Sequence, residues 1–214
     1  MVKLIPTKEE WYRALSERHG EKTQKCFESA TVAICGLGGL GSNIAFALAR
    51  AGIGKLILID FDSVDITNLH RQQYKATQIG MNKTDALKEN LSEIAPYVKI
   101  ETHSVRLDEG NAETILEKAD IICEAFDDAE CKSMLLNIVT ERIPEKYLVA
   151  ASGMAGMGSA NTIQTRRISK RFYLCGDGAS DVSEAGSLVA SRVMLCAAHQ
   201  AHTVLRILTK QFET

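Results

Sequence analysis

The chain has 214 residues, of which 45% are apolar and 24% charged, and its formal net charge is −2. This composition is typical of a globular protein and excludes a disordered chain. Because acidic and basic residues nearly balance, the charge argues against a basic nucleic-acid binder and against attraction to an anionic membrane. We therefore expect no nucleic-acid partner and no membrane partner.

The sequence contains no apolar run long enough to span a membrane. Met1–Tyr12 carries charges where a secretory signal has its apolar core. Six cysteines are present, and none of them form a CxxC pair. Cysteines within apolar runs behave as small hydrophobic residues. These features predict a reduced, cytoplasmic protein without disulfide bonds.

Apolar strand patterns alternate with helical patterns along the first two thirds of the chain. Helices are expected at 7–18 (within an N-terminal helical segment, 1–28), 42–51, 82–95, 109–118 and 129–141. Strands are expected at 31–35, 55–60, 98–103, 121–125 and 147–151. Continuous apolar strands joined by helices indicate a parallel sheet covered on both faces. With right-handed crossovers, this is a doubly wound, mainly parallel α/β fold with a Rossmann-like nucleotide site.

The pattern changes after residue 151. Residues 152–187 are expected to be rich in loops, with a strand-like alternation at 161–167. A C-terminal helix is expected over 188–210. Since no shift in composition marks a boundary, we interpret residues 1–214 as a single domain.

A glycine-rich motif joins the first buried strand to the next helix, and its glycines are Gly36, Gly38, Gly39 and Gly41. Such a turn lets backbone N–H groups approach a phosphate at the helix N-terminus. Asp60 ends the next strand, where a carboxylate meets the ribose hydroxyls. Together these features predict an adenine nucleotide site. The alternative is a glycine turn that only allows the helix to pack closely on the strand.

Polar and charged residues follow this acid, namely Asp62, Asn68, Arg71, Gln72 and Lys83. The default ligand of the glycine motif is a dinucleotide, which has a single pyrophosphate. A cluster of Arg and Lys suits the greater charge of a triphosphate better. The alternative for Arg71 and Lys83 is a solvated surface.

Two acidic residues follow the strand at 121–125. A carboxylate at that edge of the sheet could hold Mg²⁺ against phosphates, or it could cap the next helix. We assign Asp127 to the metal and Asp128 to the cap.

Four sequence runs together resemble the ThiF/MoeB branch of the ubiquitin-activating enzyme superfamily: Gly36–Gly41, Leu58–Asp62, Asn68–Gln72 and Gly80–Lys83. The resemblance covers about residues 18–210. It is strongest to the short-form ThiF proteins, which are adenylyltransferases that act on the sulfur carrier protein ThiS. It implies that the C-terminal glycine carboxylate of a ThiS-like carrier attacks the α-phosphate of ATP and releases pyrophosphate, in thiamine (thiazole) biosynthesis. It also implies Mg²⁺ and a homodimer.

The resemblance assigns roles to the candidate residues. Asp60 would hold the ribose and Asp127 the Mg²⁺, while Asn68, Arg71, Gln72 and Lys83 would surround the triphosphate. Arg18 would reach the phosphates of the partner subunit, with Arg13 as the alternative. The carrier tail would lie extended across residues 152–187.

The sequence departs from the larger relatives at two places. They use four cysteines for zinc, whereas Cys175 stands alone in the corresponding stretch, so we expect no structural zinc. They also carry a cysteine where Ser183 precedes the turn at Glu184–Gly186. Cys175 either substitutes for that thiol or is left over from the metal site.

Three other functions remain open from the sequence alone. The carrier could serve molybdopterin synthesis or tRNA thiolation in place of thiamine synthesis. The glycine motif could belong to an NAD-dependent oxidoreductase. The chain could also be a non-catalytic scaffold that only binds a ubiquitin-like partner.

Overall fold

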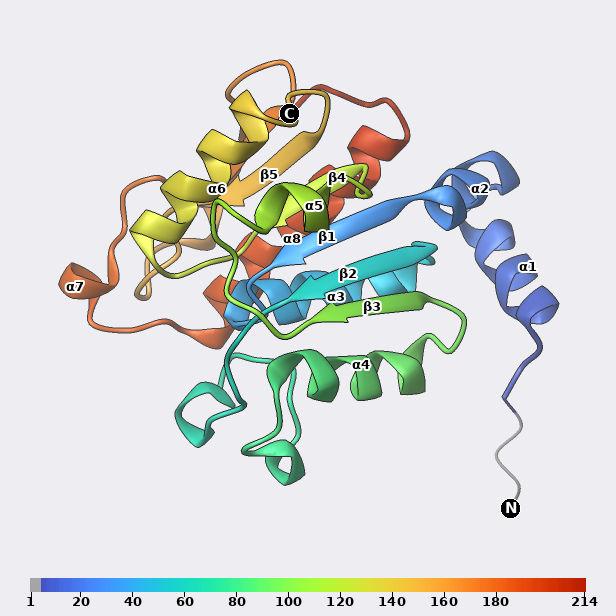
Figure 1. Ribbon diagram of the computed structural model, residues 1–214, viewed down its shortest axis with the longest axis horizontal. Helices are drawn as coiled ribbons and strands as arrows, with labels where there is room; N and C mark the ends of the chain where they lie inside the picture. The colour runs from blue at the N-terminus through green and yellow to red at the C-terminus, as the bar shows by residue number, and fades with distance from the viewer. Residues whose placement is uncertain (1–4) are drawn as a thin grey trace.

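The computed structural model describes residues 5–214, and a single seven-stranded sheet forms its centre (Figure 1). The strand order is β3-β2-β1-β4-β5-β7-β6, and every neighbouring pair is parallel except β6 and β7. The strands are β1 (Thr31–Cys35), β2 (Lys55–Ile59), β3 (Lys99–His103), β4 (Ile121–Glu124), β5 (Tyr147–Ala151), β6 (Gln164–Arg167) and β7 (Phe172–Gly176). The structure confirms the doubly wound α/β fold.

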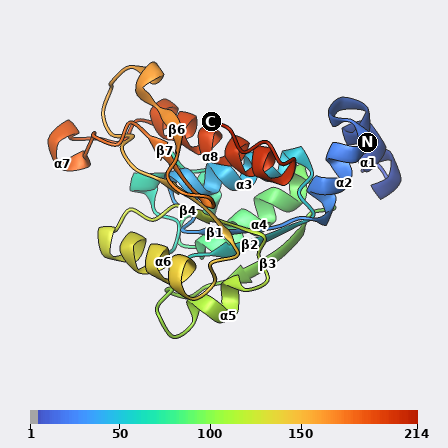
Figure 2. The same cartoon turned by 90° about the horizontal axis from the view of Figure 1, so that it is seen from above.

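Helices cover both faces of the sheet (Figure 2). The α-helices of the described residues are α1 (Lys8–His19), α2 (Glu21–Ser29), α3 (Gly39–Ala51), α4 (Lys83–Ile94), α5 (Ala112–Leu116), α6 (Ala129–Glu141), α7 (Val182–Ala185) and α8 (Ala190–Leu208), of which α3, α4, α5, α6 and α8 cover the sheet. The apolar faces of α3, α4 and α8 share one buried cluster with the sheet, and those of α5 and α6 form the other. Within residues 5–214, none of these helices is long and apolar enough to cross a membrane.

The strand β7 and the short helix α7 fall in the region expected to be rich in loops, and the sequence does not predict them. The strand pairs with β5, which buries Tyr173 and Cys175. Both segments are short, so local periodicity does not reveal them. The helix α2 lies within the N-terminal helical segment expected over 1–28, and it buries Gln24 and Phe27 against the rest of the fold.

The six mutually parallel strands end at one common edge of the sheet, called here the carboxyl edge. The connections run to opposite sides of β1, since β2 and β3 lie on one side of it and β4 and β5 on the other. Such a reversal opens a crevice at the carboxyl edge, and this is where doubly wound folds bind ligands. The helices α1 and α2 lie at the opposite edge, before the start of β1 (Figure 1).

Candidate functional site

The glycine motif turns tightly between β1 and α3 at this crevice. Gly36 has φ +91°, and a Cβ there would lie 2.8 Å from the carbonyl oxygen of Ala125. A Cβ on Gly41 would lie 1.8 Å from the carbonyl oxygen of Gly36, so packing alone requires both glycines. At Gly38 the nearest atom would be the Gln72 side-chain nitrogen at 3.7 Å, an ordinary contact. The space beside Gly38 is therefore where a phosphate can approach the backbone at the start of α3.

Substitution of Gly41 tests this packing. We expect Gly41→Ala to lower the free energy of unfolding by about 1–3 kcal/mol or more, because the methyl group cannot fit against the Gly36 carbonyl. Chemical denaturation followed by circular dichroism measures the change. Gly110→Ala is the control, since the nearest atom to its methyl group would be the flexible carboxylate of Asp108 at 3.3 Å. Equal stability of the two variants would contradict the packing.

Asp60 lies beneath the glycine turn and is 9% exposed. Its Oδ2 accepts the N–H of Leu37 at 2.6 Å, and its Oδ1 accepts the N–H of Asp62 at 2.8 Å. Burial raises the pKa of Asp60, and the charge of Lys83 and these two N–H donors oppose the rise. Because each carboxylate oxygen can accept a second hydrogen bond, Asp60 can hold the turn and still accept ribose hydroxyls.

Lys83, at the start of α4, is 5% exposed and therefore does not lie on a solvated surface. Its Nζ lies 2.7 Å from Oδ2 of Asp62 and 3.9 Å from Oδ2 of Asp60. The side chain of Asp62 is half exposed. A lysine held by carboxylates at the ribose position places a fixed positive charge at the edge of the crevice.

The segment that follows β2 is tied onto the glycine turn. The hydroxyl of Tyr74 donates to the carbonyl of Leu37 at 2.7 Å, and the side-chain amide of Asn43 in α3 donates to the carbonyl of Arg71 at 3.2 Å. The guanidinium of Arg71 donates to Oδ1 of Asn68 at 3.0 Å. The structure therefore brings Asn68 and Arg71 to the same glycine turn that Asp60 contacts.

Gln72 belongs to the same segment, and its side chain is buried against the glycine motif. Its Oε1 has no hydrogen-bond partner among residues 5–214. Buried polar atoms almost always have a partner, so an orphaned oxygen in a side chain whose Nε2 faces Gly38 fits a site that completes its contacts with a ligand.

The two acidic residues in the turn after β4, Asp127 and Asp128, make different contacts. Asp128 caps α6, because its Oδ1 accepts the N–H of Cys131 at 2.8 Å, which confirms the predicted cap. Asp127 is exposed at the carboxyl edge. In the part of the chain that the structure describes, no group of three or more His, Cys, Asp or Glu could hold a metal ion. Mg²⁺ in nucleotide sites is commonly held by one or two carboxylates and the phosphates, so a role for Asp127 needs no such group, and its assignment to Mg²⁺ stays a prediction.

Two sequence-predicted residues lie away from this constellation. Arg18 is exposed on α1 at the opposite edge of the sheet, as is its alternative Arg13 (Figure 1). The structure therefore does not bring Arg18 into the site of its own chain. Cys175 is fully buried in β7, and burial raises the pKa of its thiol. The alternative in which Cys175 replaces the missing thiol is therefore wrong, because a carrier cannot reach it.

Sequence reasoning missed two ion pairs near the carboxyl edge, each with one buried partner. Arg192 of α8 binds Asp177 at 2.5 Å, beside a hollow of about 480 Å³ beneath the loops of residues 152–187. Glu124 of β4 binds Lys132 of α6 at 2.9 Å. One signal was available, since a charged residue within an apolar strand or on the apolar face of a helix is seldom buried without a partner.

Comparisons with known proteins identify relatives of this chain. The sequence profile of the ThiF family matches residues 12–214. The adenylyltransferase and sulfurtransferase UBA4 of Lodderomyces elongisporus is 28% identical over 192 residues, which are 87% of this chain and 42% of that protein. The adenylyltransferase and sulfurtransferase MOCS3 of Culex quinquefasciatus is 36% identical over 136 residues, 63% of this chain and 31% of that protein. The chain thus spans less than half the length of these curated relatives.

Solved structures share the fold. The tRNA N6-threonylcarbamoyladenosine dehydratase TcdA of E. coli, in complex with ATP, superposes with a TM-score of 0.85 at 21% sequence identity. The match covers 97% of this chain and 98% of that chain. The fold is therefore shared over nearly the whole length of both chains.

Proposed function

The chain belongs to the ThiF family, and we propose that it is an adenylyltransferase that transfers AMP from ATP to a carboxylate and releases pyrophosphate. One observation carries this proposal. Lys83 is almost fully buried beside the ribose acid Asp60, in a crevice that also holds Arg71. A nicotinamide dinucleotide does not need this second cation beyond the glycine motif, whereas a triphosphate does. The oxidoreductase alternative is correspondingly disfavoured.

The chemistry needs charge screening more than acid–base catalysis. The attacking carboxylate and ATP are both anions, so they repel each other, and the departing pyrophosphate gains further negative charge. Fixed cations in a crevice sheltered from water oppose both effects. Asp127 would hold Mg²⁺, which when bound neutralises phosphate charge. A general base is not needed, because a terminal carboxylate is already ionised at neutral pH.

For the substrate we propose the C-terminal glycine carboxylate of a small ubiquitin-like sulfur carrier. The relatives UBA4 and MOCS3 are named adenylyltransferases and sulfurtransferases, which supports a carrier of sulfur. The narrower proposal, a ThiS-like carrier of thiamine synthesis, depends on the resemblance of the sequence to short-form ThiF. Carriers for molybdopterin synthesis or tRNA thiolation are the alternatives.

Exchange of labelled pyrophosphate into ATP tests this function. With Mg²⁺ and a ThiS-like carrier, we expect exchange that saturates with carrier concentration. The same carrier without its terminal glycine is the control and supports no exchange. If no carrier with a Gly-Gly terminus supports exchange and the protein binds NADH tightly, the oxidoreductase alternative replaces the proposal.

The cysteines provide a separate prediction. We expect the purified protein to contain no stoichiometric zinc, and Cys175→Ser to keep pyrophosphate exchange, since adenylyl transfer uses no thiol. Elemental analysis and the exchange assay measure the two quantities. Cys196→Ser is the matched control, because that thiol is also fully buried. One zinc per chain would contradict the first expectation. A folded Cys175→Ser protein that loses exchange while Cys196→Ser keeps it would contradict the second.

A further inference from the structure

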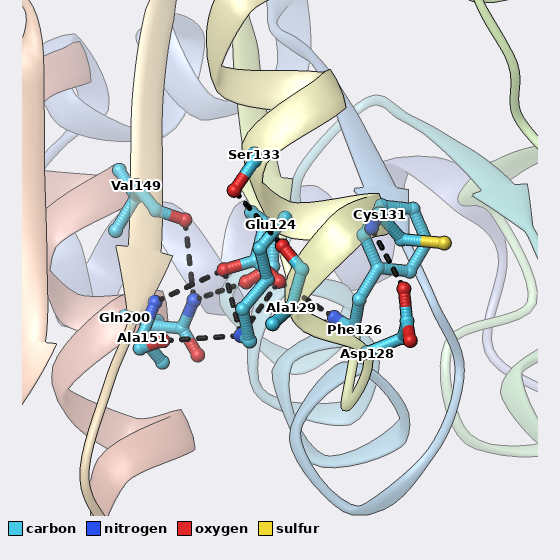
Figure 3. A network of polar contacts seen from close by, with 10 residues as sticks. Glu124, Phe126, Asp128, Ala129, Cys131, Ser133, Val149, Ala151 and Gln200 are labelled. Atoms are coloured by element: carbon cyan, nitrogen blue, oxygen red, sulfur yellow. Dashed lines mark hydrogen bonds and ion pairs between the residues drawn. The ribbon is translucent and has the colours of Figure 1, made fainter.

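An ion pair between the buried Glu124 and the partly exposed Lys132 occupies the carboxyl end of β4, in the middle of the sheet. Glu124 is 3% exposed, and its Oε1 and Oε2 lie 2.9 and 3.0 Å from Nζ of Lys132. Figure 3 shows Glu124 between the turn at Phe126 and Asp128 on one side and Ala151 on the other. Burial raises the pKa of Glu124, and the adjacent Lys132 opposes the rise.

On the nucleotide side, the pair holds the turn that carries Asp127. Oε1 of Glu124 accepts the N–H of Phe126 at 2.7 Å. The preceding carbonyl, that of Ala125, lies against Gly36 so closely that a Cβ there would approach it to 2.8 Å. The turn is therefore bound to the carboxylate and packed against the glycine motif, and Asp127 has little freedom to move away from the crevice.

On the other side, the pair holds the end of β5. Nζ of Lys132 donates to the carbonyl of Ala151 at 3.1 Å, and the N–H of Ala151 lies 3.5 Å from Oε2 of Glu124. The side-chain amide of Gln200 in α8 donates to the carbonyls of Glu124 and Val149, which ties β4 and β5 to each other through α8. Ala151 is the last residue of β5, so this contact sets where the following loops leave the sheet.

An ion pair with a buried carboxylate is a poor means of stabilising a fold, because desolvation of that charge offsets the attraction to its partner. Here the pair instead makes directional contacts to backbone groups of two segments that meet at the crevice. We propose that Glu124 and Lys132 are positioning residues, which hold the Asp127 turn and the end of β5 in register for adenylyl transfer. This inference rests on the proposed function, since it is the nucleotide and the attacking carboxylate that must meet there.

The double variant Glu124→Met/Lys132→Met tests the proposal. It replaces the pair with apolar side chains and leaves no lone buried charge, so we expect its melting temperature to stay close to that of the parent. In the nucleotide-free protein, the Phe126 amide should exchange its hydrogen faster, because its acceptor is gone. The kcat of pyrophosphate exchange should fall by roughly 10–100-fold, and the Mg²⁺ concentration for half-maximal rate should rise.

The pair of Lys55 and Glu101 provides the matched control. It joins β2 to β3 at 2.6 Å, and the side chain of Lys55 is 30% exposed, as is that of Lys132. The variant Lys55→Met/Glu101→Met should keep the parent kcat. The side chain of Glu101 is 31% exposed and that of Glu124 is 3% exposed, so the melting temperatures of the two variants can differ, but a pair that served stability alone would leave kcat unchanged at both places. A stable Glu124→Met/Lys132→Met protein with parent-like kcat or unchanged Phe126 exchange would therefore overturn the proposal.

If the double variant does not fold, the single variant Glu124→Gln tests the proposal. The amide has the shape of the carboxylate but no charge and one acceptor oxygen fewer. If its oxygen stays on Phe126 and Lys132, its NH2 group replaces the oxygen that accepts from Lys132 and from the N–H of Ala151. We expect kcat to fall by roughly tenfold or more, and a parent-like kcat would overturn the proposal. Absence of exchange in the parent protein would refute the adenylyl transfer, whereas amide exchange in the nucleotide-free proteins would still show whether the pair holds the turn.

Discussion

Lys83→Met is expected to lower the rate of pyrophosphate exchange by roughly 10²-fold or more, the scale for loss of one preorganised charge in a closed site. The methionine keeps most of the buried stem and removes only the ammonium group. That group lies 2.7 Å from Asp62 and 3.9 Å from Asp60, where the ribose and phosphates of ATP would bind. Steady-state exchange at saturating ATP and carrier measures the effect.

Lys88→Met is the matched control for this experiment. Lys88 lies on the same helix, α4, but its side chain is exposed. We expect parent-like exchange from this variant. Because Lys83 is buried against two carboxylates, Lys83→Met should also lose some stability, so its folding must be verified at the assay temperature. If a folded Lys83→Met protein exchanged pyrophosphate as fast as Lys88→Met, the assigned role of Lys83 would be wrong.

Arg18→Ala is expected to lower the exchange rate by about 10³-fold, the scale for an arginine supplied in trans in another phosphoryl transfer. The structure provides the reason to expect a second chain. Arg18 lies on α1 at the edge of the sheet opposite the crevice, so it cannot serve its own site without a large rearrangement (Figure 1). In a homodimer it could reach the crevice of the partner.

Complementation separates this arrangement from a role within one chain. Arg18→Ala and Lys83→Met proteins, each nearly inactive, should regain exchange when mixed, because one site of the mixed dimer keeps both residues. A mixture of Arg71→Ala and Lys83→Met proteins is the control and should not recover, since one chain supplies both residues to a site. If subunits exchange but the first mixture stays inactive, Arg18 acts in cis or lies outside the site. Arg13→Ala tests the alternative arginine in the same way.

Much of the fold could be predicted from the sequence because its signals are local. The strands Thr31–Cys35 and Tyr147–Ala151 and the helix Ala129–Glu141 have the predicted bounds. Each strand is a continuous apolar run between turn residues, as burial on both faces requires. The glycine motif is equally local, since the turn, the start of the helix and the phosphate approach all lie within six residues.

The site could be predicted only in part. Spacing placed Asp60 and the glycine motif at one edge, because parallel strands end together. It left open whether Lys83 was solvated, since its burial depends on two carboxylates that lie more than twenty residues earlier in the chain. Likewise, the sequence left open whether the Cys175 thiol was reachable, and the pairing of β7 with β5 decided it.

The sequence by itself determined the parallel α/β fold, the glycine motif and the position of Asp60 at the end of its strand, because these depend on local patterns along the chain. Only the tertiary structure decided the burial of Lys83, the orphaned oxygen of Gln72 and the pairing of Glu124 with Lys132. Each of these depends on which atoms the folded chain brings within about 3–4 Å of one another. Hydrogen bonds and close ion pairs act only at that range.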